Sequence, residues 1–157
     1  MNPEAEKRKL STSDVLGLST ELLASNHGVK LRLGGYSMYP SLKPGDIATI
    51  EQSPFKTLAP GDVITFKRQG RWIAHRLIKK ETVQGETILH TKGDSCLKMD
   101  ETVTAESYAG KIISIERNAK QFNMNIPYGK AIARNHYIYS LLFYVLVKVR
   151  RVLRFEY

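Results

Sequence analysis

The central part of the chain alternates between hydrophobic and polar residues, whereas its two ends do not. Residues 29–33 alternate strictly, and short hydrophobic runs follow at 47–50, 61–68, 71–80, 88–91 and 108–117. Alternation and short runs of this kind are typical of strands. Gln69 and Gly70 separate two of the runs and predict a hairpin. The pattern therefore predicts a mainly β domain over residues 29–117, built as a small antiparallel sheet or barrel.

Both ends of the chain have hydrophobic residues at helical spacing. In the charged segment 1–28, residues 11–13 can cap a helix. Its hydrophobic positions are Val15, Leu16, Leu18, Leu22 and Leu23. In the segment 118–157, one stripe of a single helix consists of Ile138, Leu142, Val145, Leu146, Val149 and Leu153. The spacing predicts an N-terminal helix before the β domain and a C-terminal amphipathic helix after it.

One loop of the β domain contains more glycines and prolines than a simple connection between strands needs. Residues 34–46 contain a pair of glycines, the isolated Ser37 and two prolines. Glycine reaches backbone dihedrals closed to other residues, and Pro40 fixes the chain just after Ser37. The loop can therefore hold the Ser37 hydroxyl at one angle, as a nucleophile requires. The alternative is an ordinary surface turn rich in glycine and proline.

Three residues downstream favour a nucleophilic role for Ser37. His75 lies in the run 71–80, on the same face as Ile73 and Leu77, and Asp94 and Asp100 follow. A serine becomes a good nucleophile when a base takes its proton, and a histidine can do this near neutral pH. An acid that bonds the second ring nitrogen fixes the tautomer and stabilises the imidazolium. The chain thus offers a serine, a histidine and two candidate acids.

Four segments carry a resemblance to a known family: GYSMYPSLKPGD, LAPGDVITF, WIAHRLI and TKGDSCLKMD. In this order they resemble the type I signal peptidases, specifically the endoplasmic-reticulum and archaeal subtype, and they lie within residues 29–117. The resemblance implies a signal-peptidase-like β fold with Ser37 as nucleophile. It implies His75 as general base, where the bacterial branch has a lysine. It assigns the acid position to Asp100 and a supporting place in the site to Asp94, with no metal or cofactor.

The resemblance also implies a substrate and leaves alternatives. Family members bind an extended peptide as an added strand, for which residues 29–33 could supply the edge. Where relatives carry a Ser-Gly pair before the nucleophile, this chain has Gly35 and Tyr36, so a side-chain donor for the oxyanion is missing. We expect a serine endopeptidase that cleaves a leader or signal segment. The alternatives are a catalytically silent peptide-binding module and a self-cleaving regulator of the SOS-repressor type.

The charge balance suggests a further partner. The formal net charge is +9, and seven basic residues but one acidic residue follow Asn118. Zinc-finger spacing and a repeated basic helix are lacking, so we expect no nucleic-acid partner. A helix with an apolar stripe and a basic polar face is typical of one that lies on an anionic membrane surface. We expect peripheral or weakly anchored membrane association. The alternatives are a cytoplasmic protein whose last helix covers its own core, and a helix with charged ends that spans the membrane.

Overall fold

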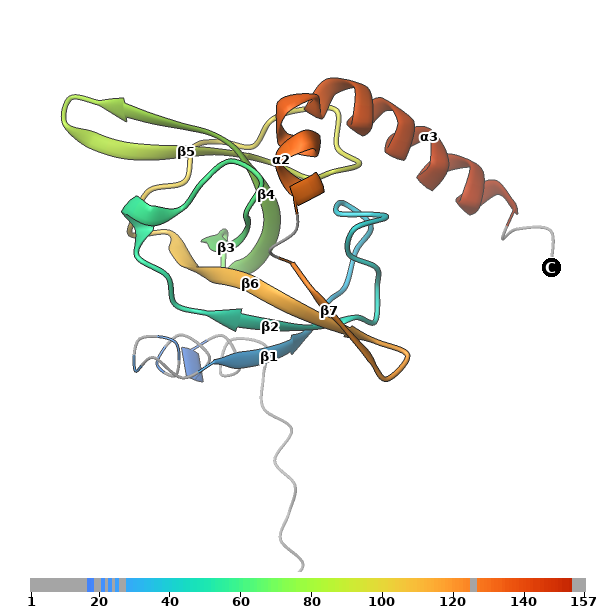
Figure 1. Ribbon diagram of the computed structural model, residues 1–157, viewed down its shortest axis with the longest axis horizontal. Coiled ribbons are helices and arrows are strands. Elements are labelled where there is room, and N and C mark those ends of the chain that lie inside the picture. Colours follow the sequence, from blue (N-terminus) through green and yellow to red (C-terminus); the bar gives the residue numbers. More distant parts are fainter. Residues whose placement is uncertain are drawn as a thin grey trace, which may run out of the picture.

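The computed structural model describes residues 28–124 and 127–153, together with Gly17, Leu18, Glu21, Leu23 and Ser25. The described elements are β1 (Val29–Arg32), β2 (Ile47–Glu51), a 3-10 turn (Phe55–Thr57), β3 (Val63–Arg68), β4 (Arg71–Val83), β5 (Glu86–Lys92), β6 (Tyr108–Arg117), β7 (Lys120–Asn123), α2 (Pro127–Arg134) and α3 (His136–Leu153) (Figure 1). The predicted mainly β, antiparallel class is confirmed. The predicted N-terminal helix falls mostly on residues outside the described part of the chain and stays a prediction.

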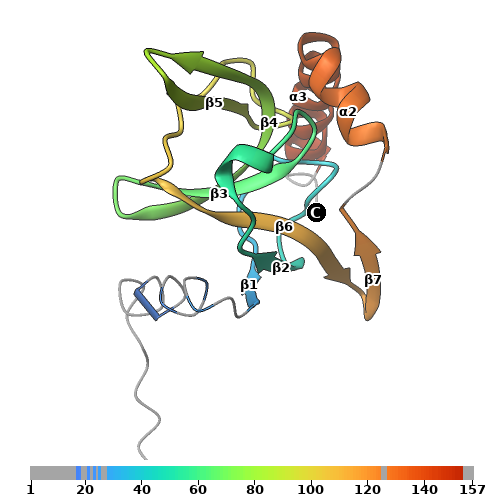
Figure 2. The same ribbon diagram turned by 60° about the vertical axis from the view of Figure 1, so that its left-hand side comes forward.

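All strands belong to one antiparallel sheet in the order β1-β2-β6-β3-β4-β5, with β7 paired to β6. Figures 1 and 2 show the sheet curved, with β1 at one end, the β4–β5 hairpin at the other, and both helices on one side. Gln69 and Gly70 connect β3 to β4 with φ angles of 50° and 68°. Their positive values are those of a tight hairpin turn, as the sequence predicts.

The core consists of two clusters that meet at β4. Trp72 and Ala74 pack on the first cluster, around Val29, Met38 and Ile112. On the other face of the strand, Leu77 belongs to the second cluster, which contains Ile64, Phe66, Leu89 and Val103, and Ile73 packs on it. The His75 ring lies 6.2 Å from the Phe66 ring, measured between centroids. The predicted shared face of Ile73, His75 and Leu77 is therefore confirmed.

The C-terminal part differs from the prediction in two ways. The sheet continues past residue 117, because β6 turns at Asn118 and Ala119 into β7. The predicted single helix is instead two, α2 and α3, separated at Asn135. The side-chain amide of Asn135 donates to the Ala131 carbonyl at 3.3 Å, a local bond of the kind that competes with helix continuation. Neither helix, within the described residues, has the length and apolar character needed to cross a membrane.

Candidate active site

The loop between β1 and β2 presents Ser37 and is closed at its base. Gly45 N donates to Leu33 O at 2.9 Å, and Leu33 N donates to Asp46 O at 2.8 Å. Inside the loop, Met38 and Leu42 are buried in the first core cluster, and Leu42 N donates to Met38 O. Gly35 has a φ of 61°, which a residue with a side chain adopts at a cost. The loop is thus anchored on both sides of Ser37.

Asp46 fixes the end of this loop. Its carboxylate accepts bonds from Lys43 N at 2.7 Å and from the Arg117 guanidinium at 2.6 and 2.7 Å. Burial alone would raise the pKa of Asp46, but the bonds from Arg117 and Lys43 outweigh burial and lower that pKa. Asp62 accepts a similar bond from Ala59 N at 2.9 Å. Asp46 and Asp62, each of which follows a Pro-Gly pair, therefore both close turns that lead into strands.

His75 on β4 is joined to Asp100. Its Nδ1 lies 2.6 Å from Asp100 Oδ2, and both side chains are largely buried. Thr91 Oγ1 donates to the same carboxylate oxygen at 2.8 Å, and Asp100 N donates to Thr91 O at 2.9 Å. Asp100 is thus held at the end of β5 and is hydrogen-bonded to one nitrogen of the His75 imidazole. The other nitrogen, Nε2, lies toward Gly93.

Gly93 lies between Ser37 and His75. A Cβ added there would lie 2.7 Å from Ser37 O and 3.0 Å from His75 Nε2. The Ser37 carbonyl oxygen and His75 Nε2 therefore both lie close to Gly93, at a position where only a residue without a side chain fits. Ser37 and His75 also line one groove of about 480 Å³, together with Gly34, Gly35 and Trp72. The structure thus brings Ser37, His75 and Asp100 into one region, from segments far apart in the sequence.

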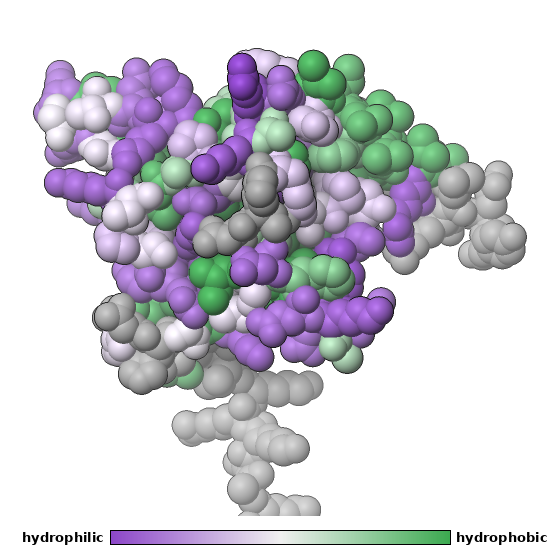
Figure 3. Space-filling model, in the orientation of Figure 1, coloured by the Kyte–Doolittle hydropathy of each residue, from purple (hydrophilic) through white to green (hydrophobic). Residues whose placement is uncertain are grey.

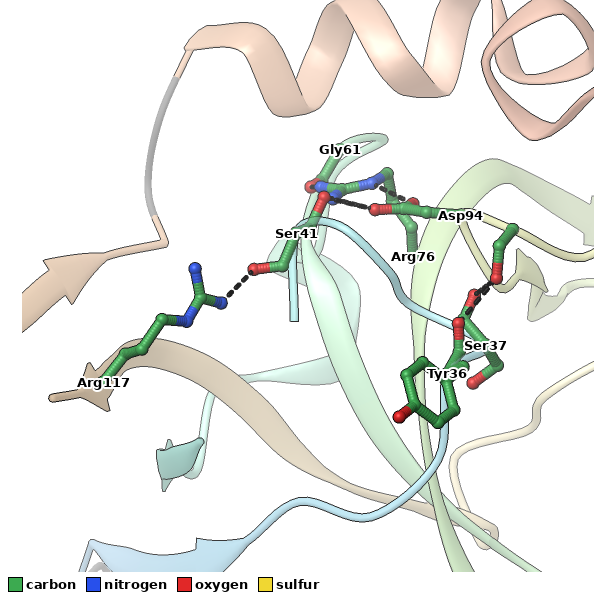
Figure 4. A network of polar contacts seen from close by, with 8 residues as sticks. Tyr36, Ser37, Ser41, Gly61, Arg76, Asp94 and Arg117 are labelled. Carbon is green, nitrogen blue, oxygen red and sulfur yellow. Dashed lines mark hydrogen bonds and ion pairs between the residues drawn. The ribbon is translucent and has the colours of Figure 1, made fainter. Parts of the chain in front are cut away.

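Asp94 has a different surrounding, drawn in Figure 4. Arg76 donates through Nε to Asp94 Oδ1 and through Nη2 to Oδ2, each at 2.7 Å. Arg76 Nη1 also donates to Gly61 O at 2.9 Å, and Ser41 Oγ donates to Asp94 Oδ2 at 2.5 Å. Both charged side chains are only 1% exposed. This network fastens the acid-bearing loop to β4, to the serine loop and to the turn before β3.

Ser95 is a residue of the site that the sequence analysis did not identify. Its hydroxyl lies 2.6 Å from Tyr36 O and 3.0 Å from Ser37 O, and its backbone N donates to Ser37 O at 2.9 Å. Ser95 thereby ties the backbone of the serine loop to the loop that carries the acids. Its place directly after Gly93 and Asp94 was the one available signal, and nothing local in the sequence indicates its contact with Ser37.

The other basic residues near β4 bond elsewhere. His90 Nε2 lies 3.0 Å from Glu81 Oε2, and Lys79 bonds the same carboxylate oxygen at 3.1 Å. Lys80 donates to the carbonyls of Lys56 and Leu58. None of these three lines the groove that contains Ser37. Of His75, His90, Lys79 and Lys80, His75 is the residue that lines the groove together with Ser37.

Cys96 lies beside Gly93, where its Sγ would be 2.6 Å from an added Cβ. Burial raises the pKa of the Cys96 thiol, and the charge of Asp100 raises it further. A thiol in this surrounding stays protonated and is a poor nucleophile. Within residues 28–124 and 127–153, no three or more His, Cys, Asp or Glu side chains are grouped so as to hold a metal ion.

Comparison with known proteins does not assign a function to this site. No protein-family model matches the chain, and no curated protein matches it. The resemblance to type I signal peptidases therefore remains an expectation carried by the four sequence segments.

Proposed function

We propose that the protein is a serine endopeptidase of the signal-peptidase type, which removes a leader or signal segment from another protein. One observation carries the proposal. Asp100 bonds His75 Nδ1 at 2.6 Å, while His75 Nε2 and the backbone of Ser37 flank the same point at Gly93. A serine, a histidine oriented by an acid and a lined groove are the parts that acyl transfer needs.

The chemistry follows from these positions. With Nδ1–H donating to Asp100, Nε2 carries no proton and can take the one on Ser37 Oγ as the hydroxyl attacks the peptide carbonyl. The imidazolium that forms is stabilised by the Asp100 carboxylate. It then protonates the leaving amine, which breaks the peptide bond and leaves an acyl group on Ser37. A water molecule, deprotonated by the same nitrogen, hydrolyses this ester and restores the serine.

The oxyanion of the tetrahedral intermediate would be bound by backbone alone. Ser37 N–H is the donor that the loop offers, since Gly35 and Tyr36 supply no small hydroxyl side chain at the preceding positions. Losing one oxyanion donor costs about 2.7 to 4 kcal/mol of transition-state stabilisation. We therefore expect slow turnover for a serine peptidase. This same feature favours the second candidate function, a peptide-binding module that does not cleave.

Two strand edges that have no partner among the described residues suit an extended peptide. In that part of the chain, β1 ends the strand order and pairs only with β2. On β4, residues 71–75 pair, among the described strands, with β3 alone, because pairing with β5 starts at Arg76 and Lys92. The groove lies between the end of β1 and this part of β4, and its lining includes Leu33, Met38 and Trp72. A peptide could add as a strand here and place apolar side chains against these residues.

The self-cleaving regulator has less support. Cleavage of that type would need an Ala-Gly bond to reach Ser37, and the one such bond in the sequence joins Ala109 to Gly110. Both residues are buried in β6, where Gly110 pairs with Thr65 and its carbonyl accepts a bond from the Thr65 hydroxyl. A bond in the interior of the sheet cannot enter the groove while the sheet is intact.

The test is cleavage of a peptide library by the whole chain, followed by mass spectrometry. We expect the protein to cut a subset of peptides, and Ser37→Ala and His75→Ala each to abolish those cuts while melting as the parent does. His90→Ala serves as the matched control and should cut normally. Peptides that bind but are never cut would favour the binding module. Cuts that persist in Ser37→Ala would overturn the proposal.

A further inference from the structure

The side of α3 that faces away from the domain is apolar. Its large hydrophobic side chains are between 44% and 72% exposed: Ile138, Leu141, Leu142, Val145, Leu146, Val149 and Val152. We call these seven residues the α3 stripe. Figure 3 shows the corresponding hydrophobic surface along the projecting helix. A contiguous apolar surface of this kind marks a site of interaction with a protein or a membrane.

The opposite side of α3 is already occupied by the domain. Ser140 is buried, and Phe143 and Tyr139 line a cavity shared with Pro40 and Ser41. At the helix start, Lys92 Nζ lies 3.3 Å from His136 Nδ1. Further along, Arg150 donates to Tyr39 Oη at 3.2 Å. These contacts fix the rotation of the helix, so the α3 stripe points outward and does not cover the core of the described domain.

The charged residues of α2 and α3 are all of one sign. The charged residues of α2 and α3 are Lys130, Arg134, Lys148, Arg150 and Arg151, and neither helix contains Asp or Glu. Lys148 and Arg150 are exposed, and Tyr137 extends from the first turn with 70% of its surface exposed. Two copies joined through their stripes would bring these like charges together. An anionic lipid surface instead complements them, and tyrosines suit its polar boundary.

We propose that α3 lies in the plane of an anionic lipid surface, with the α3 stripe among the acyl chains and Lys148 at the phosphate level. The helix has 18 residues, so its long axis would follow the surface for about 27 Å. The binding does not depend on Ser37 or on any cleavage. It concerns the outward face of α3, whereas the groove involves β1, β4 and the serine loop.

The test is sedimentation of the whole chain with vesicles of phosphatidylcholine alone or mixed with phosphatidylglycerol. We expect binding to the mixed vesicles that weakens as salt rises, because salt screens the attraction of the basic residues. Val145→Glu should lower the binding by about tenfold or more, since a charge would enter the apolar layer. Val83→Glu is the matched control, because Val83 is 45% exposed and Val145 is 48% exposed. It should bind as the parent does.

Charge reversal tests the second half of the proposal. Lys148→Glu should weaken binding to the anionic vesicles, whereas Lys79→Glu, on an exposed lysine of β4, should have little effect. Equal binding by Val145→Glu and Val83→Glu would overturn the proposal, as would a parent chain that ignores both kinds of vesicle. A dimer in solution that Val145→Glu dissociates, without lipid binding by the parent, would assign the stripe to a second copy. All variants change exposed residues, and thermal melting would check that each is folded.

Discussion

Two pairs of a basic and an acidic side chain lie next to each other in the first half of β4, and they differ in how many of their groups remain unbonded. Arg76 and Asp94 bond each other twice, and the remaining groups of the pair are taken by Gly61 and Ser41. His75, the neighbouring residue, bonds Asp100 through one nitrogen and faces the serine loop with the other. The first pair is saturated and buried, which suits a structural cross-link. The second keeps one reactive position, which suits a catalytic pair.

The two pairs differ in the partners of each side chain and in the chemistry of the base. Both pairs join a base on β4 to an acid on the loop after β5, and the two acids are six positions apart. A guanidinium has no proton to exchange near neutral pH, whereas an imidazole has one. We therefore expect substitution of Asp94 to lower stability and substitution of Asp100 to lower turnover.

The largest expected effect is that of Asp100→Asn on turnover. An amide in place of the carboxylate removes the charge that stabilises the His75 imidazolium and allows the wrong tautomer. We expect peptide cleavage to fall by about 10⁴-fold, with a melting temperature near that of the parent. Steady-state kinetics and thermal melting check this. A variant that melts much earlier yet cleaves at the parent rate would exchange the roles of the two acids.

Asp94→Asn is expected to act on stability. It leaves the Arg76 guanidinium buried without its countercharge, and breaking such a pair costs about 3 to 5 kcal/mol. Urea unfolding should show a lower midpoint with an unchanged slope. Glu101→Gln is the matched control, since Glu101 pairs with Arg68 at 3.7 Å but is largely exposed. Its midpoint should stay close to that of the parent, and equal effects of the two variants would contradict the structural role.

Gly93→Ala should affect both properties, because Gly93 lies beside both pairs. Its new methyl would meet the Ser37 carbonyl and His75 Nε2 within 3.0 Å. Overpacking of this kind costs about 1 to 3 kcal/mol, and the separation of the two groups should lower cleavage as well. Gly34→Ala, whose Cβ would point into open space, is the control for stability. A Gly93→Ala variant with parent stability and rate would mean that the close approach is absent.

Ser95→Ala is the mildest change. It removes the hydroxyl that lies against Tyr36 O and Ser37 O, and a lost hydrogen bond of this kind costs about 1 kcal/mol. We expect kcat to fall severalfold while KM stays the same, because Ser95 positions Ser37 and does not line the groove. Ser107→Ala removes a similar local hydroxyl bond in an exposed turn and should leave kcat unchanged. A rise in KM alone would contradict the positioning role.

The sheet could be predicted from the sequence where local turn chemistry marks it. Gln69 and Gly70 signal the β3–β4 hairpin, and alternation marks β1 and β6. β7 was missed because its turn, Asn118 and Ala119, has positive φ angles without a glycine, and because the whole strand is exposed. The break at Asn135 was missed because neither proline nor glycine marks it. The local sequence signals failed at these two places because neither has the glycine or proline that usually marks a turn.

The residue types of the candidate site could be predicted from local spacing, whereas the pairing of His75 with Asp100 was predicted from the resemblance alone. The spacing and resemblance single out Ser37, His75 and the two acids. Which acid reaches which base depends on how the loop after β5 folds over β4, and no local pattern encodes that. The same holds for Ser95, which contacts a residue 58 positions earlier. Contacts between segments that are distant in the chain become visible only once the sheet is assembled.

The most direct test of the central claim is the mass of the protein after reaction with a serine-directed covalent probe. If His75 and Asp100 activate Ser37, the intact chain gains one adduct, peptide mapping assigns it to Ser37, and His75→Ala gains none under the same conditions. An adduct on Ser37 that forms equally fast in His75→Ala, or a folded parent chain that never gains one, would contradict the account.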